Sequence, residues 1–382
     1  MRFLLKAGII FLNIVYFFIK LFPIRNKIAF ISRQSNKPNI DFELLGNKLE
    51  KNYKVVYLCK KLEKGVFNKI KYFFHMFKQM YHISTSKVVV LDSYCIPVGI
   101  LKHKKGVKIV QMWHALGAFK KFGKSILDKD ESNANVGEVK GISANDLSEI
   151  MGMHKNYDYI FSSSEESCIG FSEAFGYPRN KFKIYPLPRL DLIVNKDNQE
   201  KVKKKIYSKY KQLKNKENIL YCPTFRKDDS DIDHIKELIN KIDYKKYNLI
   251  LKLHPLTKLE VNDDRVVYDK SFNTYEMAFV SDYIITDYSA VIYEVSQLKK
   301  PIFIYAYDRD TYINKRDFYL NFDKDMPGEI FTDIDKLLDK INNKDYSLSK
   351  IDRFNSRYVN KYKVSYTDDI VKFIESLMDE EK

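Results

Sequence analysis

The stretch DYIITDYSAVIYEVSQLKKPIFIYAY, from Asp282 to Tyr307, decides the fold class. Its ends, DYIIT and PIFIYAY, are continuous runs of β-branched and aromatic residues, which are typical of strands buried on both faces of a parallel sheet. Between them, the DYSA segment predicts a turn into a helix that runs to about Lys299, and Pro301 opens the second strand. The stretch therefore predicts a strand–helix–strand unit of an α/β domain.

The same alternation of apolar runs and helical stretches occurs twice along the chain. The first series of predicted strands comprises KIAFIS, KVVYLC, KVVVLD, VKIVQMW and YIFSSS, and the second comprises NILYCP, NLILKLHP, RVVYD, DYIITDYS and PIFIYAY. A lysine-rich segment near residues 196–218 separates the two series and reads as a charged helix plus linker. We therefore expect two doubly wound α/β domains, covering residues 26–200 and 201–382.

Composition points to an anionic partner. The chain has 66 Lys and Arg against 50 Asp and Glu, a net charge of +16, which suits a membrane surface, a nucleic acid or a phosphorylated substrate. General enrichment in lysine is the alternative source of this charge. The four cysteines lie far apart without metal-ligand spacing, so we expect reduced thiols in a cytosolic protein. Neither a P-loop nor a metal-ligand motif is present in the sequence.

The N-terminal residues 1–25 form an apolar segment with lysines at both ends of its central run. The uninterrupted part between Lys6 and Lys20 is about 13 residues, shorter than the ~20 needed to span a bilayer. No small-residue cleavage site follows, which argues against a signal peptide. We expect a helix that lies in the interface of the cytoplasmic leaflet, with a buried core helix as the alternative.

Polar residues follow several predicted strands at the point where each strand ends. Ligands of doubly wound sheets bind outside the carboxyl ends of the strands, so we expect these side chains to line one cleft between the two domains. They are His114, Thr224, Arg226, His254, Asp287 and Ser289.

Four of these residues suit the binding or the chemistry of an anionic ligand. The guanidinium of Arg226 presents a rigid fork of donors that fits phosphate oxygens, although an ordinary surface arginine is the alternative. Ser289 or Asp287 would cap the following helix, whose first N–H groups would face the cleft and attract an anion. His254 ends a strand before Pro255, and an imidazole titrating near pH ~6.5 can serve as an acid or a base.

Six motifs in order resemble the CDP-glycerol glycerophosphotransferase family of teichoic-acid synthesis: WHALGAFKKFG, PLPRLD, YCPTFRKDD, LKLHP, ITDYSAVIYEVSQLKKPIFIYAYD and FDKDMPGEI. The resemblance spans roughly Ile28 to Ile330. It implies a GT-B-like fold with two Rossmann-type domains facing a cleft. It also implies transfer of glycerol phosphate or ribitol phosphate from a CDP-polyol to a membrane-anchored acceptor, with CMP leaving. Ala115 and Ala290 depart from the family pattern, which usually has glycine and a second serine there.

The resemblance also implies roles for particular residues. His114 and His254 are the expected catalytic residues: His114 removes the proton of the acceptor hydroxyl, while His254, Arg226 and Ser289 hold the donor diphosphate. Thr224 and Asp287 are expected to orient these groups. Glu294, Arg189 and Asp191 are expected to line the substrate site. The alternative for Glu294 is a solvent-exposed side chain, and for Arg189 and Asp191 it is a structural role. Lys120, Lys121 and Lys124 are expected to attract the anionic acceptor or the lipid surface.

The implied enzyme is a peripheral protein on the cytoplasmic face of the membrane that makes a teichoic-acid or capsular polymer. The sequence predicts no metal site and no cofactor beyond the CDP-polyol, and it leaves the metal requirement open. A GT-B glycosyltransferase using a nucleotide sugar is the alternative with the same fold. A basic binding protein without catalysis is a third possibility, but no nucleic-acid module is recognisable in the sequence, and we expect no nucleic-acid partner.

Overall fold

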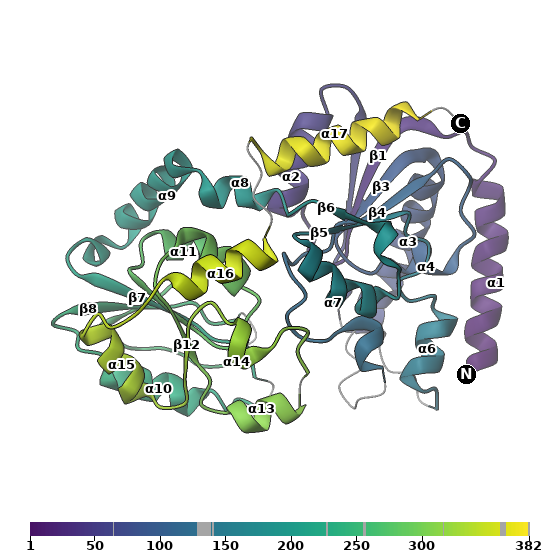
Figure 1. The fold of residues 1–382 in the computed structure, drawn as a ribbon. Coiled ribbons are helices and arrows are strands. Elements are labelled where there is room, and N and C mark those ends of the chain that lie inside the picture. The colour runs from purple at the N-terminus through teal and green to yellow at the C-terminus, as the bar shows by residue number, and fades with distance from the viewer. Residues whose placement is uncertain are drawn as a thin grey trace. The chain divides into compact units, whose positions relative to one another are not determined.

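The structure is a computed structural model that describes residues 1–63, 65–127, 139, 141–226, 228–254, 257–315, 317–359 and 364–380. The chain divides into two compact units (Figure 1). Unit 1 comprises residues 1–117, 121–189 and 360–382, and unit 2 comprises residues 118–120 and 190–359. Each unit has its own parallel sheet, which confirms the prediction of two doubly wound α/β domains.

The sheet of unit 1 has the order β2-β1-β3-β4-β5-β6, with all pairs parallel. Its central strands are buried because they consist of the β-branched runs noted in the sequence. The described strands are β1 (Arg25–Ser32), β2 (Lys54–Cys59), β3 (Ser86–Leu91), β4 (Lys108–Gln111), β5 (Tyr159–Ser162) and β6 (Phe182–Ile184).

Helices surround this sheet, and local capping residues fix where several of them begin. Asn39 accepts the backbone N–H of Phe42, and Ser164 accepts that of Ser167. The described helices of unit 1 are α1 (Arg2–Ile19), α2 (Ile40–Leu49), α3 (Val66–Thr85), α4 (Ile96–Ile100), α6 (Ala144–Ile150), α7 (Glu165–Phe175) and α17 (Tyr366–Asp379).

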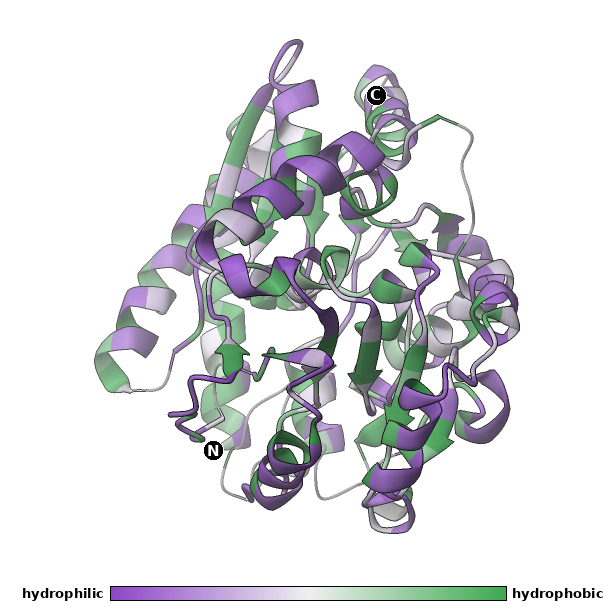
Figure 2. Cartoon of the chain, turned by 90° about the vertical axis from the view of Figure 1, so that its left-hand side faces the viewer, coloured by the Kyte–Doolittle hydropathy of each residue, from purple (hydrophilic) through white to green (hydrophobic). Residues whose placement is uncertain are grey.

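The sheet of unit 2 has the order β12-β11-β10-β7-β8-β9, again with all pairs parallel. Figure 2 shows strands coloured mostly hydrophobic and surrounding helices that mix hydrophobic and hydrophilic residues. The described strands are β7 (Glu217–Cys222), β8 (Tyr247–Leu251), β9 (Val266–Tyr268), β10 (Tyr283–Thr286), β11 (Ile302–Tyr305) and β12 (Glu329–Phe331).

The core of unit 2 forms where amphipathic helices cover this sheet. Ile235 and Leu238 of one helix and Leu337 and Ile341 of another belong to the same buried cluster as the strand residues. The described helices are α8 (Arg189–Val194), α9 (Lys196–Lys209), α10 (Ile232–Lys241), α11 (Thr274–Phe279), α12 (Ile292–Val295), α13 (Arg309–Lys315), α14 (Phe322–Asp325), α15 (Ile334–Asn342) and α16 (Ser349–Tyr358).

The predicted domain boundaries need correction. The chain passes from unit 1 to unit 2 after Arg189 rather than after residue 200, and it returns to unit 1 at residue 360. The physical reason is the apolar face of α17, which packs on α2 and β3 and buries Ile370 and Ile374. The lysine-rich helix α9 belongs to unit 2, where it packs against α11.

The N-terminal segment forms one continuous helix, α1, that is part of unit 1. It is long and apolar enough to cross a membrane by length and composition, in contrast to the shorter run counted in the sequence. One side is fixed to the unit: Tyr16 is fully buried and bonds His103 at 3.0 Å, and Asn13 donates to the carbonyl of Ile100. The other side is exposed, including Phe3, at 81%.

Candidate active site

Each sheet has one point where the strand order reverses, and such switch points are where doubly wound folds bind ligands. In unit 1 the reversal lies between β1 and β3, and in unit 2 between β7 and β10. The residues singled out from the sequence lie mainly in the loops that follow these strands and their neighbours.

His114 lies in unit 1, three residues beyond the end of β4. Its Nδ1 lies 2.9 Å from the carbonyl oxygen of Asp92. A carbonyl oxygen can only accept, so Nδ1 must carry the hydrogen, and Nε2 of the neutral ring then has the free lone pair. Burial lowers the pKa of His114, and the positive charges of Arg189 and Arg33 lower it further. The ring is therefore neutral near pH ~7, as a general base must be.

Asp92 follows β3 directly and is fully buried. Its carboxylate accepts hydrogen bonds from Asn39 Nδ2 at 2.9 Å and from Ser93 Oγ at 2.8 Å. Burial raises the pKa of Asp92 to about 6, although these hydrogen bonds and one from Ser32 oppose the rise. The carboxylate thus anchors the loop whose carbonyl group orients His114.

The residue before His114 has an uncommon backbone conformation. Trp113 has φ 62°, in the left-handed region that non-glycine residues rarely adopt. Its N–H donates to Gln111 Oε1 at 2.9 Å, and its ring stacks on Phe122 at 4.9 Å between centroids and contacts Phe175. Such strain persists where the surroundings over-determine it, often at functional sites. Here it turns the chain between the buried strand and His114.

Arg189 bridges two parts of unit 1. Its backbone N–H and its Nε donate to the two carboxylate oxygens of buried Asp41, at 2.8 and 2.9 Å. Its Nη2 also donates to the carbonyl oxygen of His114 at 3.2 Å. Asp191, two residues on, is half-buried in α8 and belongs to unit 2.

The three lysines after the WHALGA motif are divided between the two units. Lys120 is assigned to unit 2, where its backbone pairs with Phe318 and its ammonium lies 5.2 Å from the centroid of the Tyr312 ring. Lys124 lies in a 3-10 helix of unit 1, and burial lowers its pKa, with a further contribution from Lys155. Lys121 is half-buried in unit 1. Attraction of an anionic acceptor or lipid surface by these lysines stays a prediction.

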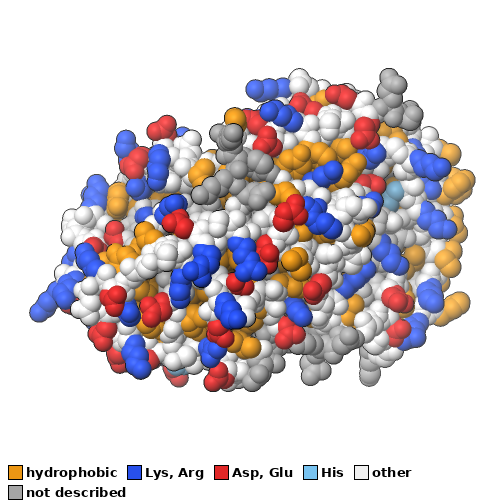
Figure 3. Space-filling model, in the orientation of Figure 1, with side chains coloured by type: hydrophobic (Ala, Val, Ile, Leu, Met, Phe, Trp, Pro, Cys, Tyr) orange, Lys and Arg blue, Asp and Glu red, His pale blue; other side chains and the backbone are white. Residues whose placement is uncertain are grey.

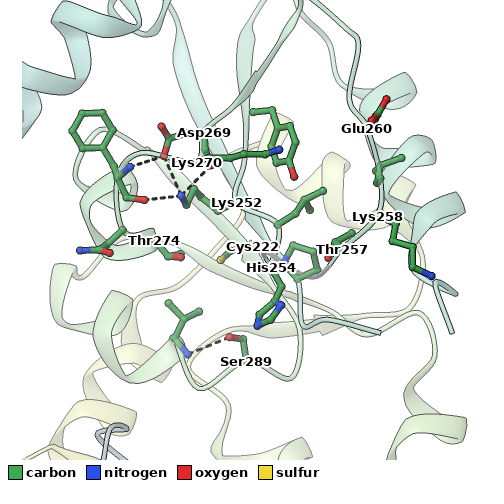
Figure 4. A pocket seen from close by; sticks show the side chains of 17 residues that line it. Cys222, Lys252, His254, Thr257, Lys258, Glu260, Asp269, Lys270, Thr274 and Ser289 are labelled. Atoms are coloured by element: carbon green, nitrogen blue, oxygen red, sulfur yellow. Dashed lines mark hydrogen bonds and ion pairs between the residues drawn. The ribbon is translucent and has the colours of Figure 1, made fainter. Parts of the chain in front are cut away.

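A pocket of about 690 Å³ opens in unit 2 at the carboxyl ends of β7, β8, β9 and β10 (Figure 4). His254 and Ser289 both line it, and in the close-up their polar groups point to the same part of the pocket. Three lysines, Lys252, Lys258 and Lys270, also line it. The pocket thus offers several cationic and polar donors, which suits an anionic ligand.

One of these lysines also braces the pocket wall. Lys252 Nζ donates to Asp269 Oδ2 at 3.0 Å and to the carbonyl oxygen of Phe272 at 2.6 Å. Asp269 in turn accepts the backbone N–H of Phe272 and the hydroxyl of Tyr210 at 2.8 Å. This network fixes the segment between β9 and α11. Lys258 and Lys270 are exposed; Lys258 Nζ donates to Asp229 Oδ2 at 3.2 Å, and Lys270 Nζ lies 4.6 Å from the centroid of the Tyr268 ring.

Arg226 differs from its expected position. It is 6% exposed, and its Nη2 donates to Asp287 Oδ2 and its Nε to Asp308 Oδ2, each at 3.1 Å. Its Nη1 donates to the carbonyl oxygen of Thr224 at 2.9 Å. A buried guanidinium requires such carboxylate partners, and they turn its donors into the protein. Tyr312 covers the guanidinium at 4.5 Å.

Thr224 and Asp287 belong to the same network. The backbone N–H and the hydroxyl of Thr224 both donate to Asp287 Oδ1, at 2.8 and 2.7 Å. This joins the loop after β7 to the loop after β10 at the switch point of the sheet. Neither residue lines the described part of the 690 Å³ pocket, and neither does Arg226.

The helix expected after DYSA is shorter than predicted. Its α-helical part, α12, covers Ile292–Val295, and one 3-10 turn leads to Lys299, which has φ 53°. Ser289 Oγ accepts the N–H of Val291 at 3.3 Å, in agreement with a turn-capping role. A helix this short has few aligned peptide dipoles, so anion attraction must come mainly from nearby side chains. Glu294 is buried in α12 rather than exposed.

Sequence reasoning missed Asp41, Asn39 and Asp92, which hold His114 in place. A signal existed for Asp92, because it ends the KVVVLD run just as His114 follows VKIVQMW. No local pattern marks Asp41, whose partner lies 148 residues away. Within the described residues, no group of three or more His, Cys, Asp and Glu side chains could hold a metal ion.

Comparison with known proteins places the chain in a family. Residues 14–376 match the family model of CDP-glycerol:poly(glycerophosphate) glycerophosphotransferase. The teichoic acid ribitol-phosphate primase of Bacillus spizizenii is 30% identical over 372 residues, covering 94% of this chain and 93% of the relative. The teichoic acid glycerol-phosphate primase of Bacillus subtilis is 30% identical over 315 residues, covering 80% and 77%.

The fold has a counterpart among solved structures. A structure of the wall teichoic acid polymerase TagF superposes with a TM-score of 0.71 at 22% identity, covering 99% of this chain and 97% of that one. This likeness agrees with the GT-B-like arrangement of two parallel α/β sheets. On the family match over most of its length, the chain belongs to the CDP-glycerol:poly(glycerophosphate) glycerophosphotransferase family.

Proposed function

We propose that this chain transfers glycerol phosphate or ribitol phosphate from a CDP-polyol to a hydroxyl group of a lipid-linked acceptor and releases CMP. The observation that carries the proposal is the pocket at the carboxyl ends of β7 to β10, which combines His254, Ser289 and lysines in a volume of about 690 Å³. A volume of several hundred cubic ångströms suits a small nucleotide ligand. We assign the CDP-polyol to this pocket.

His114 serves as the general base of the proposed reaction. Its Nε2 takes the proton of the acceptor hydroxyl while the hydroxyl oxygen bonds to the β-phosphorus of the donor. The bond between the β-phosphorus and the bridging oxygen breaks, and CMP leaves with that electron pair. His254 and Ser289 donate to the diphosphate, whose charge must be stabilised as it shifts to the leaving group.

Arg226 has an indirect role in this proposal. Through Asp287 and Thr224 it fixes the two loops that flank the switch point, rather than contacting phosphate itself. Lys258 and Lys270 replace it as the cationic contacts of the donor. The reaction uses no metal in this proposal.

The exposed side of α1 supports contact with the cytoplasmic face of a membrane. Its exposed residues Phe3, Ile10, Phe17, Phe11 and Phe18 recur at helical spacing. Figure 3 shows hydrophobic side chains, with lysine and arginine side chains nearby, along the part of the surface where α1 lies. Such a surface suits an interfacial helix on anionic lipid, and would place a peripheral enzyme next to a lipid-linked acceptor.

The activity is tested by incubating the protein with CDP-glycerol, CDP-ribitol or a UDP-sugar, each with a membrane-derived lipid acceptor. CMP release with a product heavier by one polyol phosphate supports the proposal. UDP release with sugar transfer, and no CMP from either CDP-polyol, would instead support a nucleotide-sugar transferase.

The membrane role is tested by vesicle flotation of the double variant Phe11→Asp, Phe18→Asp. We expect it to stay in solution while the wild type floats with anionic vesicles. Ile169→Asp, which places a charge at an exposed residue of α7, is the matched control and should float normally. Equal flotation of all three proteins contradicts a membrane role for α1.

A further inference from the structure

Asp41 and Arg189 form a buried ion pair beside His114. Asp41 is fully buried in the first turn of α2, and its two carboxylate oxygens accept the backbone N–H and the Nε of Arg189. The pair is also a salt bridge through Nη2, and the side chain of Arg189 is 17% exposed. A carboxylate in such a place is stable only while its partner stays in position.

The pair reaches the catalytic loop through one further hydrogen bond. Nη2 of Arg189 donates to the main-chain oxygen of His114 at 3.2 Å, while the ring Nδ1 bonds to the main-chain oxygen of Asp92 at 2.9 Å. His114 is therefore held at its backbone and at its ring by two separate elements. Since Nδ1 donates to Asp92, Nε2 is the ring nitrogen that can accept a proton.

We propose that Asp41 and Arg189 are positioning residues, which hold the loop of His114 so that its Nε2 is aimed at the acceptor hydroxyl. This inference rests on the proposed function of His114 as the base, and it reassigns Arg189 from substrate binding to positioning. Arg189 is the last residue of unit 1 before the chain enters unit 2, so the pair also fixes that point of the chain next to the base.

The described ion pair between Arg179 and Glu165 of unit 1 lacks this arrangement. Arg179 pairs with Glu165 through two nitrogens, but both side chains are exposed, at 47% and 69%, and the other described contact of the Arg179 side chain is with the carbonyl of Phe182. Exposed pairs contribute little, whereas a displacement of ~1 Å at a reacting group can lower a rate about 10²-fold. Arg179→Gln is therefore a matched control for Arg189→Gln.

The charge of Arg189 gives the pair a second, measurable effect. The charges that act on the imidazole are those of Arg189 and of Arg33, which follows β1, and the carbonyl group of Asp92 holds its Nδ1. Burial is the main cause that lowers the pKa of His114, and the charge of Arg189 adds to it. Removing that charge should move the pKa of His114 upward, whereas Arg189→Lys keeps the charge and removes only the fork.

The test compares Arg189→Gln, Arg189→Lys, Asp41→Asn and Arg179→Gln. For Arg189→Gln we expect kcat to fall about 10- to 100-fold with the KM for the CDP-polyol unchanged, and the acid limb of the pH–rate profile to move to higher pH. For Arg189→Lys we expect the loss in kcat without the pH shift. Arg179→Gln should behave as the wild type.

Three outcomes overturn the proposal. One is wild-type kcat and an unmoved acid limb in Arg189→Gln. Another is a rise in KM that accounts for the whole effect, which would return Arg189 to substrate binding. The third is an unchanged pKa of His114 in Arg189→Gln. That pKa is measured by NMR titration of the histidine ring signals, and the signal of His114 is assigned as the one missing from the spectrum of His114→Gln.

The NMR titration also separates this inference from the proposed function, because it needs no turnover. If the wild type releases no CMP from any CDP-polyol, the proposed function fails, and the titration still decides whether Arg189 sets the state of His114. If Asp41→Asn does not fold, Arg189→Lys and Arg189→Gln still decide the result. In both variants the carboxylate of Asp41 still accepts the backbone N–H of residue 189.

Discussion

The two units have closely related parallel sheets, yet their carboxyl ends are built differently. In unit 1 the polar residues bond to one another: Asn39 to Asp92, and Asp92 through its carbonyl to His114. In unit 2, Arg226, Asp287 and Thr224 also bond to one another, but His254 is exposed at a pocket of about 690 Å³ whose lining includes three lysines. The comparison suggests that unit 1 holds a preset reactive group, while unit 2 leaves room for a charged ligand.

The largest expected effect tests whether unit 1 holds the reactive group, and it concerns His114. His114→Ala should lower turnover about 10²- to 10⁴-fold, the usual range for loss of a general base. Donor affinity, measured by calorimetry with a CDP-polyol, should change little because the donor pocket lies in unit 2. Loss of donor affinity in this variant would show that the two histidines have the opposite roles.

Arg226 tests whether a polar residue of unit 2 stabilises the fold or binds the donor. Arg226→Ala leaves Asp287 buried without its cationic partner, and breaking a buried pair in this way costs about 3–5 kcal/mol of the free energy of unfolding. Urea unfolding measures this. Arg265→Ala, which breaks a more exposed pair with Asp263, is the control and should cost about 0–1 kcal/mol. Unchanged stability with lost donor binding would instead mean that Arg226 contacts phosphate.

Within the pocket, His254 should matter more than Ser289. A hydrogen bond to a charged group contributes about 1.5–3 kcal/mol, so His254→Ala should weaken CDP-polyol binding roughly 10- to 100-fold. Ser289→Ala removes one neutral hydroxyl and should weaken it less than about 10-fold. His234→Ala is a control, because His234 stacks on Tyr307 and does not line the described pocket. Equal CDP-polyol affinity in all three variants would show that the donor does not bind in this pocket.

The smallest effect concerns pH. The pKa of His114 is lowered by burial, so the ring stays unprotonated to a pH below the usual value of about 6.5. Activity that depends on the neutral base is lost only as pH falls through that lowered pKa. The acid limb of kcat should therefore lie below pH ~6.5 and disappear in His114→Ala. A limb at or above ~6.5 would mean that the imidazole is more solvated than the structure has it.

Much of the fold follows from the sequence because the strands are long β-branched runs. Each run named in the sequence forms a strand, from KIAFIS in β1 to PIFIYAY in β11. The edge strands β6 and β12 were missed because each has three residues, one of them charged (Lys183 and Glu329), so neither forms an apolar run. Such short edges form because a neighbouring strand is already in place, which no local pattern records.

The candidate site was predictable only where chain position alone places a side chain. His254 and Ser289 were found because they follow strands at the carboxyl end of the sheet, and they line the pocket. The direction of the Arg226 side chain was not predictable, since it depends on Asp308, 82 residues away. The Asp41–Arg189 pair was not predictable for the same reason, because the two residues are 148 positions apart and come into contact only in the folded chain.

The return of the chain to unit 1 has a consequence for the order in which the protein is made. α17 covers α2 and β3, yet it begins at Tyr366, roughly 180 residues after Arg189. At synthesis rates of about 5–20 residues per second, the apolar surface that α17 covers stays exposed for roughly 10–35 s before α17 is synthesised. Unit 2 is nearly continuous in sequence and can complete its fold in that interval. We therefore expect nascent unit 1 to be the part that holdase chaperones bind, and loss of α17 to cause aggregation during synthesis rather than slow unfolding later.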